Sequence, residues 1–135
     1  MTTVLDRHFA PLQAALDLRG YRQQLLAANM ANSDTPNYRA VDLNFTAAMR
    51  AALSGQGAAP ALKTDQGGQL QPAAQPEPAA AFVAYQAGDN VRLDGNSVDM
   101  NRQQSAFASN SIQYEADLTF VTGKIKNLLA AITAN

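Results

Sequence analysis

The stretch that decides the fold runs from Met100 to Ile132 and reads MNRQQSAFASNSIQYEADLTFVTGKIKNLLAAI. Ten of its positions are spaced alternately four and three residues apart, and eight of the ten are apolar. They are Met100, Gln104, Phe107, Ser111, Tyr114, Leu118, Val121, Ile125, Leu128 and Ile132. This alternation predicts one long helix with a heptad seam, the pattern of a coiled coil. Asn96, Ser97 and Asp99 precede the helix and are residue types that favour N-caps.

The positions beside this seam indicate what the helix packs against. In a solvated two-stranded coiled coil they usually carry charge, but here small and apolar residues intrude, such as Leu129 and Ala131 near the C-terminus. We therefore expect more than one packing partner. A purely intramolecular interpretation stays open, in which this helix packs only on an N-terminal helix.

A main N-terminal helix is predicted to begin at Pro11, after a short first turn that Thr3 and Asp6 could start in the manner of a capping box. Pro11 suits a first helical position, and the residues that follow are mostly good helix formers. The helix carries two apolar lines, which indicates neighbours on two sides, since a surface helix normally has a single apolar stripe. The first line consists of Leu12, Leu16, Leu26 and Met30, and the second of Leu18, Tyr21 and Leu25.

A polar cluster from Asn29 to Asn37 marks the end of this helix. Pro36 disfavours a helical conformation at Thr35. Pro36 and Asn37 suit the centre of a type II turn, because asparagine tolerates the positive φ of the second position. The alternating apolar residues that follow predict an extended segment before a short alanine-rich stretch, residues 46–53.

The middle of the chain has low complexity. Gly, Pro, Ala and Gln make up 20 of the 27 residues in 54–80, and such a segment buries too little apolar surface to offset its ordering entropy. Phe82, Val83 and Tyr85 predict a short strand, and Asp94-Gly95 a turn. The expected organisation is a helix and turn in 1–53, a flexible segment in 54–80, an extended segment in 81–96 and the heptad helix in 97–135. The predicted fold is mainly α: a coiled-coil hairpin of two long terminal helices, with a flexible middle and room for a short β-hairpin.

Composition excludes several classes of function. The ten Lys and Arg residues are scattered and the net charge is −1, so the basic footprint of a nucleic-acid-binding protein is missing. The chain has no cysteine, which excludes disulfide scaffolds and thiol chemistry. We find neither the apolar core of a secretory signal peptide nor a stretch long enough to span a bilayer. Taken alone, these absences favour the cytosol.

Catalytic and metal chemistry find no support in the sequence. His8 is the only histidine and has no partner at metal-ligand spacing. The acidic residues between Asp89 and Asn96 do not meet the spacing of an EF-hand loop and are better explained by a turn. Glu115 and Asp117 point to different sides of their helix. We therefore predict no catalytic residue, no cofactor and no metal site.

The segment Ala28-Asn29-Met30-Ala31-Asn32-Ser33-Asp34-Thr35-Pro36-Asn37-Tyr38-Arg39 resembles the A-N-x-x-T-P-G-Y signature of the flagellar axial proteins, which form the rod, hook and filament. Segments 41–45, 94–100, 110–114 and 123–126 are similar to the proximal rod subunits of that family. Asn37 replaces the usual glycine, and Gln103 stands where the family often has an acidic residue. The resemblance makes six residues an assembly motif: Asn29, Asn32, Thr35, Pro36, Asn37 and Tyr38. It also makes Leu18, Leu25 and the apolar seam residues a coiled-coil interface.

The resemblance further implies export by the flagellar type III apparatus without a cleaved signal, which reconciles the missing signal peptide with a periplasmic rod. The terminal helices would form the inner layer of a tube that transmits torque to the hook. The implied partners are copies of the chain, other proximal rod subunits, and an adaptor at the rod base near the export gate. The alternative function is a cytosolic coiled-coil adaptor or secretion chaperone.

Overall fold

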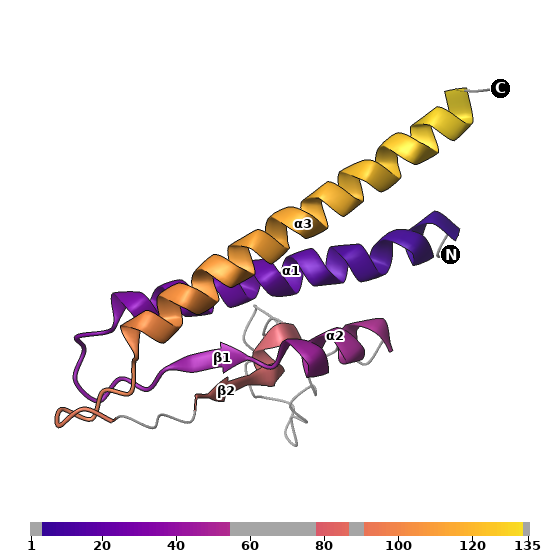
Figure 1. Ribbon diagram of the computed structural model, residues 1–135. Coiled ribbons are helices and arrows are strands. Elements are labelled where there is room, and N and C mark those ends of the chain that lie inside the picture. The colour runs from indigo at the N-terminus through magenta and orange to yellow at the C-terminus, as the bar shows by residue number, and fades with distance from the viewer. Residues whose placement is uncertain (1–3, 55–77, 87–90, 134–135) are drawn as a thin grey trace, which may run out of the picture.

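The computed structural model describes residues 4–54, 78–86 and 91–133 of the 135-residue chain. Two long helices, α1 (Val4–Ala31) and α3 (Met100–Thr133), lie side by side and diverge toward their free ends. A smaller layer lies on the other side of α1 and contains α2 (Phe45–Leu53), the 3₁₀ helix η1 (Pro78–Phe82) and two short strands (Figure 1). The prediction of a mainly helical chain with long terminal helices is confirmed.

Helix α1 begins earlier than its proline indicates. The expected start at Pro11 is wrong, because the helix begins at Val4 and includes Pro11 in its interior. A proline near the beginning of a helix removes one backbone donor while its fixed φ still suits the helix. The predicted stop is confirmed, since the helix ends at Ala31. The backbone N–H of Asn32 still donates to the carbonyl of Ala28 at 3.1 Å.

Helix α3 has 34 residues, which gives a length of roughly 51 Å at about 1.5 Å per residue. Its cap is Asp99, whose Oδ1 accepts the backbone N–H of Arg102 at 3.1 Å. Asn96 and Ser97, the other predicted caps, instead hold the loop that leads into the helix.

The strands β1 (Val41–Leu43) and β2 (Val83–Tyr85) pair antiparallel, with Val41 opposite Tyr85. The two strands thus come from opposite sides of segment 55–77, which lies outside the described residues, as does most of the predicted flexible segment 54–80. Leu43 of β1 and Leu18 of α1 are buried in a small core. The other residues of this core are Ala48 and Ala79, with Tyr21, Leu25, Phe45, Met49, Phe82 and Val83 partly buried around them.

Candidate assembly surface

Asn29 lies at the centre of a buried polar network and has no exposed surface. Its Nδ2 donates to the carbonyl of Val41 at 2.7 Å and to Oε1 of Gln103 at 3.0 Å. Its Oδ1 accepts the backbone N–H of Val41 at 3.1 Å and the hydroxyl of Tyr38 at 3.3 Å. The amide thereby uses both donors and accepts two bonds, as a buried polar group requires.

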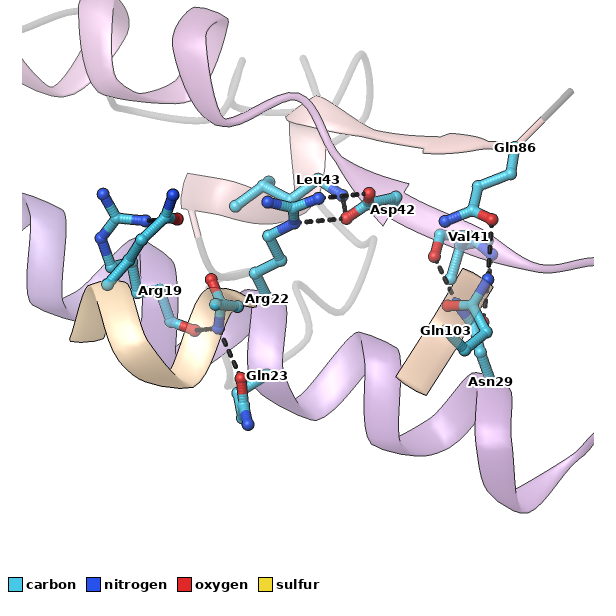
Figure 2. Close-up of polar contacts among 11 residues, drawn as sticks. Arg19, Arg22, Gln23, Asn29, Val41, Asp42, Leu43, Gln86 and Gln103 are labelled. Carbon is cyan, nitrogen blue, oxygen red and sulfur yellow. Dashed lines mark hydrogen bonds and ion pairs between the residues drawn. The ribbon is translucent and has the colours of Figure 1, made fainter. Parts of the chain in front are cut away.

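Gln103 extends this network across the molecule. It is fully buried, and its Nε2 donates to Oε1 of Gln86 at 2.8 Å. Figure 2 shows Asn29, Gln103, Gln86 and Val41 converging from α1, α3 and the segments around the two strands. Gln103 therefore joins α3 to α1 and to the segment after β2 through amide hydrogen bonds.

The predicted turn carries the rest of the assembly motif. Asn37 adopts a φ of 60°, so the expectation of a positive φ is confirmed. Its backbone N–H donates to the carbonyl of Asp94 at 2.9 Å. Thr35 donates from Oγ1 to Oδ1 of Asn32 at 3.1 Å, and Asn32 donates from Nδ2 to the carbonyl of Ala28 at 2.8 Å. The structure therefore brings five of the six motif residues into hydrogen bonds, while Pro36 is exposed in the turn.

The loop before α3 is hydrogen-bonded to this turn. Asn96 is fully buried, and its Nδ2 donates to the carbonyls of Asn32 at 3.0 Å and Thr35 at 2.8 Å. Ser97 Oγ accepts the backbone N–H of Ala40 at 3.0 Å. We predicted Asn96 and Ser97 only as helix caps. Nothing in their local sequence distinguishes a cap from a bond to a turn about sixty residues away.

Several hydrogen bonds between polar side chains join α1 to α3. Arg19 donates to Asp117 and to Gln113, as Figure 2 shows in part. Gln23 donates from Nε2 to Ser111 Oγ at 2.7 Å. Asn110 donates to the carbonyl of Arg19 at 3.0 Å. The two buried residues of α3 are Gln103 and Asn110, which lie one position before the seam positions 104 and 111.

A second polar contact joins α1 to the strand layer. Arg22 donates from Nε and Nη2 to the two carboxylate oxygens of Asp42, at 2.8 and 2.7 Å (Figure 2). This bidentate bond raises the pKa of Arg22, while burial opposes the rise. The pair fixes the direction in which the chain leaves the turn, since Asp42 belongs to β1.

The predicted coiled-coil interface residues divide into three groups. Leu18 and Leu25 belong to the small core with α2 and β1. Met100, Phe107 and Val121 of α3 are half-buried. The remaining seam residues are exposed: Tyr114 (36%), Leu118 (42%), Ile125 (52%), Leu128 (38%) and Ile132 (74%). From Tyr114 to Ile132, α3 therefore presents an apolar face to solvent. An interface between this face and other chains stays a prediction.

Within the described ranges, no group of three or more His, Asp or Glu side chains is placed to hold a metal ion. Among the helices that the structure describes, none combines the length and apolar character needed to cross a membrane.

Buried amides join the two long helices, and α3 presents an exposed apolar face. These are features of a helical structural subunit. Comparison with known proteins specifies which kind. No protein-family model matches the chain. It is 39% identical over 131 residues to the flagellar basal body rod protein FlgB of Escherichia coli K12, covering 96% of this chain and 95% of that protein.

Two further relatives bear the same name. The FlgB protein of Salmonella typhimurium is 37% identical over 134 residues, covering 93% of this chain and 95% of the relative. That of Proteus mirabilis HI4320 is 34% identical over 137 residues, covering 98% of both chains. The chain belongs to the FlgB family of flagellar basal body rod proteins. The resemblance to the axial proteins is confirmed, and with it a structural role in the flagellum.

Proposed function

We propose that the chain assembles into the proximal rod by burying the exposed apolar face of α3 against neighbouring chains. One observation carries the proposal. The intramolecular contact of α3 uses polar residues such as Asn110, whereas Leu118, Ile125 and Ile132 remain exposed. Large apolar patches on a folded chain mark interaction surfaces, and this patch follows a heptad spacing suited to another helix.

The energetics support assembly over a stable isolated state. Burying one Leu or Ile contributes roughly 1.5–3 kcal/mol, so several seam residues together offset the entropy of joining chains. When identical chains join through two different surfaces, the assembly grows as an open helix unless the rotation between neighbours closes a ring. Such contacts build a helical tube, which fits a rod that transmits torque to the hook.

We further propose that the chain reaches the periplasmic rod through the flagellar type III apparatus, without a cleaved signal, and acts there without catalysis. Its partners are copies of itself, other proximal rod proteins, and an adaptor linking the rod base to the membrane ring and export gate. Membership of the FlgB family and the axial motif at Asn29–Tyr38 support these assignments.

Mass spectrometry of purified hook–basal bodies from the source bacterium tests the proposal. We expect several copies of the chain per particle, retained through detergent extraction. Intact particles that lack the chain, with the chain recovered in the cytosol, would contradict it.

The second candidate is a cytosolic coiled-coil adaptor or secretion chaperone, which the long heptad helix also favours. Such a protein would form a discrete helical dimer by itself. Circular dichroism with analytical sedimentation separates the two: a stable, strongly helical dimer supports the adaptor, and a monomer that associates without a defined end point supports the rod subunit.

A further inference from the structure

Four residues of α3, spaced seven apart, all form hydrogen bonds with α1. We call them the polar stripe: Gln103, Asn110, Asp117 and Lys124. Their partners on α1 are, in the same order, the side chain of Asn29, the carbonyl of Arg19, the side chain of Arg19 and the carbonyl of His8. A spacing of seven keeps residues on one face of a helix, so the polar stripe lies on the face that α3 turns toward α1.

Helix α1 carries a heptad line of its own, and the centre of this line is polar. Its six positions alternate four and three residues apart: Leu12, Leu16, Arg19, Gln23, Leu26 and Met30. The two central residues meet the polar stripe, since Arg19 donates to Asp117 and Gln23 Oε1 accepts from Nδ2 of Asn110. At this level the two helices therefore meet through polar side chains, at positions that are apolar in most coiled coils.

Asn110 is almost fully buried but only partly satisfied. Its exposed fraction is 1%, and its Oδ1 has no hydrogen-bond partner in the part of the chain that the structure describes. A buried acceptor without a partner is destabilising, so Asn110 weakens the helix pair relative to an apolar residue. A buried asparagine in a heptad can lower stability while it selects a single alignment of the helices.

An apolar alternative lies directly beside the polar stripe on α3. Leu118 and Ile125 each follow a stripe residue and are 42% and 52% exposed. A rotation of α3 about its axis, by less than the roughly 100° between consecutive residues, would turn them toward α1. They would then lie near the level of Leu12 and Leu16, which are half-buried on the heptad line of α1. The rotated pair would bury more apolar surface and leave less of the seam for other chains.

We propose that Asn110 and Asp117 are positioning residues, which hold α3 in the rotation that keeps its apolar seam available to other chains. Their partners are Arg19 for both and Gln23 for Asn110. In the rotated pair these groups would lose their partners, and an unpaired buried polar group is costly. The rotation is a property of the single chain, whereas its effect on assembly rests on the proposed rod function.

Cysteine labelling of the isolated chain measures this rotation, because the natural chain contains no cysteine. Ile125→Cys places a thiol on the seam, and Ser109→Cys places one at an exposed position of α3 outside the seam. In the natural background both thiols should react with iodoacetamide at comparable rates. Adding Asn110→Leu and Asp117→Leu should slow alkylation at position 125 roughly fivefold or more, because a buried thiol reacts only when the helix pair opens. The rate at position 109 should stay the same.

A second variant separates rotation from a loss of folding. Changing α3 alone leaves Arg19 without its acid, so a four-residue variant adds Arg19→Leu and Gln23→Leu and thereby completes an apolar heptad line on α1. It should protect position 125 equally and unfold at a higher denaturant concentration than the natural chain. The matched control, Asn101→Leu with Glu115→Leu, replaces an amide and an acid at exposed positions of α3. It should leave alkylation at position 125 unchanged.

The outcomes separate this inference from the proposed function. If position 125 reacts in both variants as fast as in the natural background, or faster, Asn110 and Asp117 do not set the rotation of α3 and the inference is overturned. Protection of position 125 supports it, and the same substitutions should then lower incorporation into basal bodies roughly tenfold or more. Protection combined with normal incorporation would leave the positioning role standing and contradict the seam as the assembly surface.

Discussion

The Nδ2 atom of Asn29 lies 3.0 Å from Oε1 of Gln103, a residue 74 positions later in the chain, and neither side chain has exposed surface. This bond joins the two terminal helices at the closed end of the hairpin. It pairs a residue of the axial motif with one outside it. The register of α1 and α3 is therefore fixed by buried amides, which stabilise a single alignment because an unpaired buried amide is costly.

Replacing Asn29 by alanine should destabilise the chain by about 1–3 kcal/mol, because the N–H and carbonyl of Val41 and the amide of Gln103 lose a partner. Denaturant unfolding of the purified chain measures this. Asn101→Ala, which changes an exposed asparagine on α3, serves as the control and should not lower the unfolding midpoint, because alanine is the better helix former. Equal stability of the two variants would show that the network does not fix the helix pair.

Gly95→Ala should destabilise the chain by more than about 1 kcal/mol, because Gly95 has a φ of 79° that L-residues adopt at a cost. The added Cβ would also lie 2.5 Å from Oδ1 of Asn37. Gly123→Ala is the matched control: its Cβ meets nothing within 4 Å, and it should stabilise α3 by about 0.8–1 kcal/mol.

A double-mutant cycle isolates the clash from the backbone strain. Asn37→Gly removes Oδ1. Combined with Gly95→Ala, it should recover the part of the lost stability that is due to the clash, but not the part due to the positive φ at position 95. Strict additivity of the two substitutions in thermal unfolding would mean that Asn37 and Gly95 are not in contact.

Arg22→Lys should lower stability by about 0.5–1 kcal/mol, because lysine cannot reproduce the bidentate bond to Asp42. The bond raises the pKa of Arg22, so its contribution is present at lower pH and is lost only as pH rises through that raised pKa. We therefore expect the difference between natural chain and variant to stay constant from about pH 6 to pH 9, below the range in which either the arginine or the substituted lysine titrates. Unfolding midpoints across this interval check the prediction, and a difference that shrinks toward pH 9 would contradict it.

Leu118→Asp and Ile125→Asp should abolish incorporation into the rod while changing the stability of the isolated chain by no more than about 0.5 kcal/mol, because both side chains are exposed. Ser109→Asp places the same charge at another exposed position of α3 and should assemble. Swimming assays and basal-body recovery provide the readout. Normal motility of both seam variants would remove the apolar seam from the interface.

The elements themselves were predictable because they depend on local signals. The four-three spacing from Met100 to Ile132 predicted a helix that the structure extends from Met100 to Thr133. Pro36-Asn37 predicted a turn with positive φ, which Asn37 adopts. The start of α1 was misplaced, because a proline near a helix N-terminus fits the first position and the first turns almost equally well.

The sequence by itself determined the two long helices, the turn between Thr35 and Tyr38, and the family. Only the tertiary structure decided which face of α3 meets α1. The apolar seam suggested a coiled coil, yet the buried positions are Gln103 and Asn110. The reason is physical: an amide on a helix gives the same local signal whether it faces water or a partner such as Asn29, and only the folded chain brings that partner within hydrogen-bonding distance.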